Sequence, residues 1–129
     1  MHKPCPCDAS HCYAQCCEPY LKGTATAATP EILMRSRYSA FAKRKFAYLA
    51  KTMAGSATTT FNLQQAQKDA VDLKWLKLEV LNAKTQGSSG TVEFKAHFQF
   101  KGQTGLIHEL SQFDKINDKW FYVDQLPLT

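Results

Sequence analysis

Five cysteines lie within the first seventeen residues, and none follows; the stretch reads CPCDASHCYAQCC. Two close pairs, one separated by a single residue and one adjacent, are joined by eight residues, enough for a turn and a short helix that returns the second pair. Zinc prefers four soft ligands converging at about 2.3 Å on one point. The spacing predicts one Zn²⁺ ion held by Cys5, Cys7, Cys16 and Cys17.

Other uses of these thiols stay open. Disulfides fit poorly, because five is an odd number and adjacent cysteines bond only through a strained ring. A four-cysteine iron–sulfur cluster is an alternative, although adjacent ligands are unusual for it. Redox-active or free thiols are another. Cys12 is interpreted as a spare thiol, and His2 and His11 flank the cluster as substitute ligands for which four thiolates leave no vacancy.

Length and composition predict one folded domain with a short appendage. The chain has 129 residues, of which 44% are hydrophobic and 12% aromatic, and this is enough for a packed core. No run approaches the roughly 18 apolar residues that span a bilayer, so no membrane association is expected. The opening MHKPCPC does not resemble a signal peptide. We therefore expect a cytoplasmic protein, in a compartment where clustered thiols stay reduced and bind metal.

Charge is distributed unevenly. The formal net charge is +5, and residues 32–67 contain no acidic side chain. A solvated helical face is the simpler interpretation, and a nucleic-acid or ribosome contact through this segment is the alternative. The six basic residues concerned are Arg35, Arg37, Lys43, Arg44, Lys45 and Lys51.

Composition divides the chain into three segments. Residues 1–20 are cysteine-rich, residues 21–29 (LKGTATAAT) are small and polar and are expected to form a surface linker, and residues 30–129 have the composition of a folded domain.

The folded domain is expected to open with helices. Thr29 is a plausible N-cap and Pro30 suits a first helical position. Residues 45–53 continue as a second helix or as an extension of the first, GSATTT breaks it, and residues 62–73 form a third helix. The first helix is expected to have one apolar face, made of Leu33, Met34, Tyr38, Phe41 and Ala42.

After residue 73 the hydrophobic period changes to two. Leu76, Leu78 and Val80 are expected to face the core, and residues 92–100 alternate most clearly. Residues 106–115 and 119–126 follow as strands after short turns. Helices followed by an antiparallel meander of about four strands predict an α+β domain with helices packed on one face of the sheet.

The cysteine segment resembles the SEC-C motif, a zinc-binding module also found at the tail of the preprotein-translocase motor. That motif has C-x-C, eight residues, then C-C or C-H, which matches the four ligands predicted above and leaves Cys12 outside them. The usual Gly-Ser-Gly after the first pair is Asp8-Ala9-Ser10 here. This departure alters the turn and removes no ligand.

The rest of the chain resembles the YchJ-like family of small, uncharacterised bacterial proteins. The resemblance is carried by CCEPYLKG, TPEILMRSRYSAF, YLAKT and HELSQFDKINDKWFYVD. It implies a nuclear transport factor 2-like core, a cone of curved antiparallel sheet and helices, preceded by the zinc knuckle. It implies no reaction. In the translocase motor the similar tail docks a chaperone, so a protein-interaction module is one expected function.

A cone of this kind often holds a pocket, which makes a small-ligand-binding module the companion expectation and an isomerase- or dehydratase-like enzyme the alternative. No Gly-rich phosphate loop, Ser-His-Asp order or paired-carboxylate motif indicates an enzyme. Arg35 or Arg37 is expected to pair with Glu109, either as a structural ion pair or as part of a site for a small anionic ligand. Pairing of two chains through the open sheet face is a further expectation. The candidate pocket residues are Arg35, Arg37, Tyr38, His108, Glu109, Trp120 and Tyr122.

Overall fold

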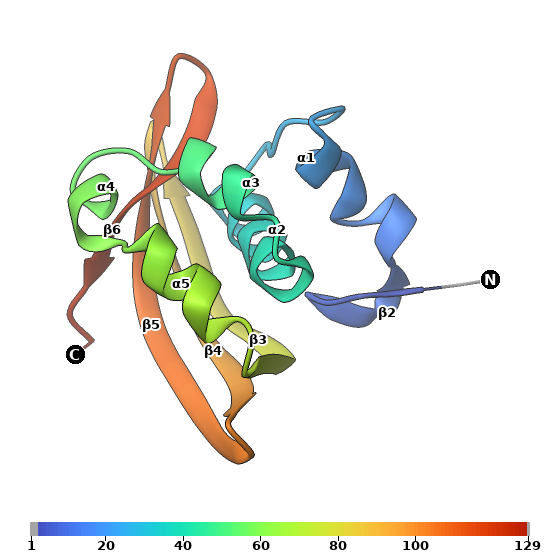
Figure 1. The fold of residues 1–129 in the computed structure, drawn as a ribbon. Coiled ribbons are helices and arrows are strands. Elements are labelled where there is room, and N and C mark those ends of the chain that lie inside the picture. Colours follow the sequence, from blue (N-terminus) through green and yellow to red (C-terminus); the bar gives the residue numbers. More distant parts are fainter. Residues whose placement is uncertain (1–2, 129) are drawn as a thin grey trace.

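Three layers make up the protein, and the helix α2 lies in the middle one. The computed structural model describes residues 3–128. A four-stranded antiparallel sheet is the first layer, helices cover one of its faces, and the cysteine-rich segment lies on the far side of α2 (Figure 1). Helices followed by an antiparallel meander confirm the predicted α+β class.

The cysteine-rich layer is a small hairpin followed by a helix. β1 (Pro4–Cys5) pairs antiparallel with β2 (Asp8–Cys12), then a 3-10 turn η1 (Tyr13–Gln15) leads to α1 (Glu18–Lys22). α1 ends at Gly23, whose φ of 83° is the left-handed conformation that glycine accepts at a helix end without steric cost. Helix α1 therefore continues past residue 20, the last residue of the cysteine-rich segment as defined from composition.

Helix α2 (Pro30–Lys43) begins as its sequence predicts. The Thr29 hydroxyl accepts a hydrogen bond from the Ile32 amide at 3.1 Å, and Pro30 takes a first-turn position where no N–H donor is needed. Arg44, with φ of 60°, ends the helix. α3 (Phe46–Lys51) is therefore a separate helix rather than an extension.

The segment after α3 departs from the expected pattern. GSATTT contains a one-turn helix, α4 (Ala57–Thr60). α5 (Leu63–Asp69) starts at the N-cap Asn62, whose side chain accepts a hydrogen bond from the Gln65 amide. It ends before residue 73, because Leu73 already pairs with Phe100 as the first residue of the sheet.

The sheet has the order β3 (Leu73–Gln86), β4 (Ser89–Phe100), β5 (Gln103–Ile116) and β6 (Lys119–Leu126). A bulge interrupts β3 at Leu76: Trp75 pairs with Phe98 and Lys77 with His97, which leaves Leu76 between them. The expectation that Leu76 faces the core is wrong, since the side chain is 47% exposed and Trp75 packs against the core instead. The extra residue at a bulge reverses the alternation.

Helix α2 is buried on more than one side. Residues 36–40 are all buried, which spans more than a full turn, so the helix lacks the single apolar face that was expected. It packs against β3, β4 and β6 on one side and against α1 on another. Within residues 3–128, no helix is long and apolar enough to cross a bilayer.

Candidate metal centre and cavity

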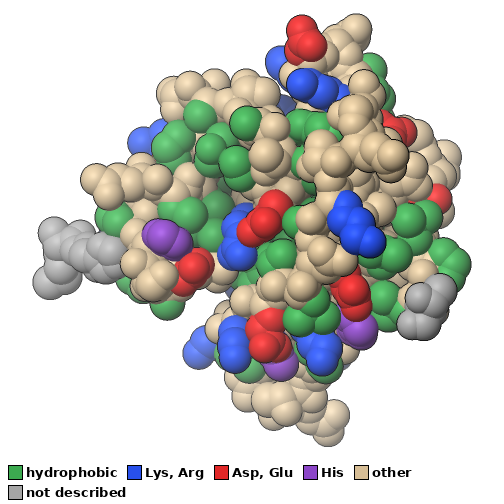
Figure 2. Space-filling model, turned by 180° about the vertical axis from the view of Figure 1, so that it is seen from behind, with side chains coloured by type: hydrophobic (Ala, Val, Ile, Leu, Met, Phe, Trp, Pro, Cys, Tyr) green, Lys and Arg blue, Asp and Glu red, His purple; other side chains and the backbone are tan. Residues whose placement is uncertain are grey.

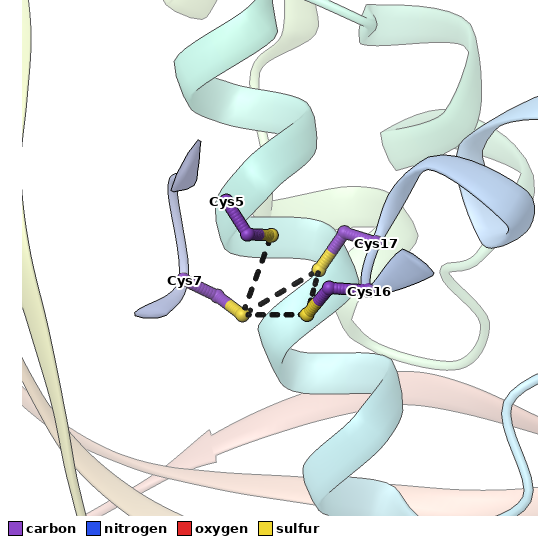
Figure 3. A group of neighbouring side chains, drawn as sticks. All are labelled: Cys5, Cys7, Cys16 and Cys17. Carbon is purple, nitrogen blue, oxygen red and sulfur yellow. Dashed lines mark hydrogen bonds between the residues drawn. The ribbon is translucent and has the colours of Figure 1, made fainter. Parts of the chain in front are cut away.

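The four cysteines predicted to bind one ion lie together. The Cys7 sulfur is 3.7 Å from that of Cys5 and 3.6 Å from those of Cys16 and Cys17, and the last two sulfurs are 3.9 Å apart (Figure 3). All four atoms lie within 4.8 Å of one another. Sulfurs arranged tetrahedrally at 2.3 Å from a shared ion are about 3.8 Å apart. The arrangement fits one tetrahedral ion.

Two short elements hold the sulfurs in place. Cys5 and Cys7 come from the β1–β2 hairpin, and Cys16 and Cys17 from the junction between η1 and α1. The side chain of Asp8 accepts hydrogen bonds from both the amide and the hydroxyl of Ser10, at 3.0 and 2.7 Å. These bonds stabilise the start of β2, directly after the turn at residues 6–7.

Helix α2 closes the centre from the third side. The Cys5 sulfur lies 3.6 Å from the Ser39 hydroxyl, and the Cys17 thiol donates to the Arg35 carbonyl at 3.6 Å. The Arg35 guanidinium donates back to the Cys7 carbonyl at 3.2 Å. Cys5, Cys7 and Cys17 are each 2% exposed and belong to the main hydrophobic core. The centre is thus part of the core rather than a separate knuckle on a tether.

The four neighbouring thiols change one another's ionisation. Interactions with the Cys17 and Cys7 thiols lower the pKa of the Cys5 thiol. Interactions with the Cys5 and Cys7 thiols raise the pKa of the Cys17 thiol. Burial raises the pKa of Cys16. Protein atoms alone therefore favour one thiolate among the four, and a divalent ion would supply the charge that lets the others ionise.

Other potential ligands lie apart from this group. All five cysteines are free, and Cys12 is not among the four whose sulfurs converge. The exposed His11 ring lies 3.5 Å from the Asp8 carboxylate. His2 lies outside the described residues.

A second candidate site lies between the helices and the sheet. It is a cavity of about 450 Å³ with mostly apolar walls. Four of the predicted pocket residues line it: Arg37, Tyr38, Glu109 and Tyr122. The aromatic walls of the cavity were not predicted from the sequence. The bulge in β3 changes the face of the sheet on which Trp75 lies. No local pattern indicated that α5 would line the cavity. The unforeseen aromatic wall residues are Phe41, Phe46, Phe61, Trp75, Phe94 and Phe113.

Glu109 is the main polar group of the β5 wall. Its Oε2 atom accepts hydrogen bonds from the Ser111 hydroxyl and from the Tyr122 hydroxyl, the latter at 3.2 Å. Burial raises the pKa of Tyr122, and the nearby Glu109 charge adds to this effect. The phenol is consequently held in its neutral, donating form.

The expected ion pair between Glu109 and an arginine does not form within the described residues. Arg37 is buried, and its Nη1 donates to the Leu49 carbonyl at 2.8 Å and to the Thr52 hydroxyl at 2.5 Å. Its guanidinium lies 5.0 Å from the centre of the Tyr122 ring. Burial lowers the pKa of Arg37 to about 10. Tyr122 thus connects the two charges, through its ring face and its hydroxyl.

Three predicted pocket residues do not line the cavity. Arg35 pairs with Glu31 at 2.9 Å beside the cysteines. His108 lies 2.7 Å from Glu93 on the opposite face of the sheet, because neighbours along a strand alternate faces and Glu109 points inward. Trp120 is buried beneath the segment before α2, where its ring N–H donates to the Ala28 carbonyl.

Comparison with known proteins identifies the family of this chain. Residues 29–125 match the family model of YchJ, middle NTF2-like domain. The chain belongs to the YchJ-like family. UPF0225 proteins of Serratia proteamaculans and Sodalis glossinidius are each 39% identical to it, over 96% of this chain and 83% of theirs. The family resemblance and the NTF2-like fold expected from the sequence are confirmed.

Solved structures agree with the YchJ-like assignment. The solution structure of a SEC-C motif containing protein from Rhodopseudomonas palustris has a TM-score of 0.88 and 35% identity, covering 98% of this chain and all of that one. A crystal structure of a SEC-C motif containing protein from Psychrobacter arcticus has a TM-score of 0.81 and 31% identity, covering 98% and 85%. A calcium/calmodulin-dependent kinase II association domain from Exiguobacterium sibiricum, at 9% identity and a TM-score of 0.53, shares the fold alone.

In this YchJ-like chain, the basic segment makes mostly intramolecular contacts. Arg35 and Arg37 are engaged as described, and Arg44 donates to the Ala70 carbonyl at 2.8 Å. Lys43 and Lys51 lie over tyrosine rings. Figure 2 shows acidic, basic and histidine side chains interspersed on the face of the molecule opposite to the view of Figure 1. These contacts weaken the nucleic-acid alternative, which needs a continuous basic surface.

Proposed function

We propose that this YchJ-like chain is a zinc protein in which one ion, bound by four thiolates, has a structural role. The observation that carries the proposal is the mutual approach of the four sulfurs within 4.8 Å. An iron–sulfur cluster distributes its cysteine ligands over two or more irons and would separate them further, so the spacing favours a single ion. Four sulfur ligands leave no open coordination position for metal-centred catalysis.

The role follows from what the ligands contact. Cys5 and Cys17 touch α2 directly, and the hairpin carries few apolar groups besides its cysteines. A segment this short does not bury enough surface to fold alone, and metal binding supplies the missing free energy. The ion would fasten the first layer to α2.

Metal analysis of two matched serine variants tests this proposal. Freshly purified, reduced protein is expected to be colourless and to contain one zinc per chain by inductively coupled plasma mass spectrometry. Cys16→Ser removes a ligand and is expected to lose most of the metal, whereas Cys12→Ser, which changes a thiol outside the group, retains it. Iron with visible absorption, no metal in the wild type, or equal loss in both variants would contradict it.

Binding of a small molecule in the cavity is the second candidate function. Its support is the cavity of about 450 Å³ with apolar walls and a few convergent polar groups, the usual make-up of a ligand site. An isomerase- or dehydratase-like enzyme would use the same cavity. Fold analogy is the sole support for such a reaction, and ligand binding is therefore the narrower proposal.

Partner and location remain proposals of the same kind. The outer edge of the hairpin, residues 9–11, is exposed and available to a protein partner. Pairing of two chains through the open face of the sheet stays a prediction. We place the protein in the bacterial cytoplasm, where five free cysteines stay reduced.

A further inference from the structure

The lining of the cavity indicates the chemistry of its ligand. We propose that the cavity binds a flat aromatic small molecule that carries a positively charged or neutral N–H donor, received by the carboxylate of Glu109. The inference rests on the ligand-binding function proposed above and specifies the ligand class for that site. Three features carry it: the aromatic wall, the available oxygen of Glu109 and the charge balance of the lining.

Aromatic rings in mutual contact form one wall. The Trp75 ring lies 5.6 Å from that of Tyr38 and 5.8 Å from that of Phe41, and Phe41 lies 6.0 Å from Phe61, all measured between ring centres. All four side chains line the cavity. Aromatic rings prefer offset or edge-to-face partners, so such a wall suits a flat aromatic guest.

Glu109 is positioned to accept a hydrogen bond from a guest. The hydroxyls of Ser111 and Tyr122 both donate to Oε2, which fixes the carboxylate. Among residues 3–128 no side chain donates to Oε1, and the residue is half-buried at the cavity wall. A carboxylate oxygen in a mostly apolar cavity is an acceptor for an N–H or ammonium group.

The charges of the lining oppose an anionic guest. Two carboxylates, Asp69 and Glu109, line the cavity against one guanidinium, that of Arg37. The Nη1 of Arg37 is engaged by Leu49 and Thr52, and one face of its guanidinium lies over the Tyr122 ring. An anion would face the repulsion of both carboxylates. The lining therefore favours a cationic or neutral ligand over the small anion that was one of the two alternatives considered from the sequence.

Two indole probes of similar size and opposite charge test the inference. Tryptamine carries an ammonium group and indole-3-acetate a carboxylate, and each is titrated into the zinc-containing protein at pH 7. Binding is followed by two-dimensional NMR through the indole N–H signal of Trp75 and the amide signal of Ser111. We expect tryptamine to bind more tightly than indole-3-acetate by about tenfold or more.

A matched pair of variants locates the effect. Glu109→Gln keeps the shape and removes the charge, and it is expected to abolish the preference for tryptamine. Glu93→Gln removes a carboxylate from the opposite face of the sheet, where Glu93 contacts His108, and is expected to preserve it. Ala66→Trp places a large side chain in the cavity lining and is expected to weaken both probes. The wild-type comparison remains decisive if a variant fails to fold.

The outcomes separate the two proposals. If neither probe shifts the signals of Trp75 or Ser111 at millimolar concentration, the ligand-binding function itself fails. If both bind but indole-3-acetate binds as tightly or more tightly, the cavity binds ligands and the assigned ligand class is wrong. A preference that survives in Glu109→Gln would also overturn the role given to Glu109.

Discussion

Tyr38 belongs both to the core and to the cavity wall. Its side chain is 5% exposed and meets the Trp75 ring edge to face. Burial, with a smaller contribution from charge on Cys7, raises the pKa of Tyr38 to about 12. The folded protein therefore holds this phenol neutral over a range of pH in which an unfolded chain, with a tyrosine pKa of about 10, would ionise it.

Stability at alkaline pH is expected to depend on Tyr38. Because its pKa is raised on folding, its contribution is fully present below about pH 10 and is lost as the pH rises to about 12. The Tyr38→Phe variant has no phenol proton to lose. Over this interval its free energy of unfolding should therefore fall by roughly 2 kcal/mol less than that of the wild type. Urea unfolding between pH 9 and 12 measures the difference. Parallel pH profiles for both proteins would contradict it.

At the scale of elements, β4 and the start of α2 approach each other unusually closely. A Cβ atom added at Gly90 would lie 2.4 Å from the Pro30 ring and 2.9 Å from the Lys84 carbonyl oxygen. Gly90 and Pro30 are themselves buried. A glycine here allows the N-terminus of α2 to rest directly on the sheet, which sets the position of the whole helix.

Gly90→Ala is expected to destabilise the protein by about 1–3 kcal/mol, the usual cost of overpacking, because neither the Pro30 ring nor the Lys84 carbonyl can move aside like a flexible side chain. Urea denaturation measures it as a lower midpoint with an unchanged slope. Ser89→Ala, at the exposed neighbouring position, is the control and should change little. Equal midpoints for the two variants would contradict the close packing described here.

At the scale of the whole molecule, α2 is enclosed by the sheet on one side and the cysteine layer on the other (Figure 1). Its buried residues include small ones, Ser36, Ser39 and Ala40, which permit this double contact. Residues on α2 also line the cavity, among them Met34 and Tyr38. The cysteine cluster and the cavity therefore share one helix.

Removal of the proposed metal ion is expected to destabilise the whole protein. A free metal ion present at 100 times its Kd adds about 2.7 kcal/mol to the free energy of unfolding. A strong chelator should therefore lower the Tm by several degrees. Hydrogen exchange of the α2 amides should accelerate with it. Cys12→Ser should respond as the wild type does. An unchanged Tm after verified metal loss would mean that the cysteine layer does not hold α2.

Local pattern predicted a good part of this structure. The grouping of the four cysteines, the Thr29 cap and the strands β4 to β6 all depend on spacing over a few residues, and the structure has them. Their physical basis is short-range: a loop of eight residues, a hydroxyl near three free amides, or side chains alternating along a strand. The cone-shaped NTF2-like fold was predicted from the family resemblance.

Contacts between distant segments were decided by tertiary structure alone. The bulge that exposes Leu76 depends on how β3 pairs with β4, and the burial of α2 on two sides depends on where the cysteine layer packs. Glu109 accepts a hydrogen bond from Tyr122 and does not pair with Arg37. The arginine instead donates to the Leu49 carbonyl in α3 and to the Thr52 hydroxyl at the end of that helix. Such choices are made by competition among partners far apart in the chain, and hydrophobic period contains no information about that competition.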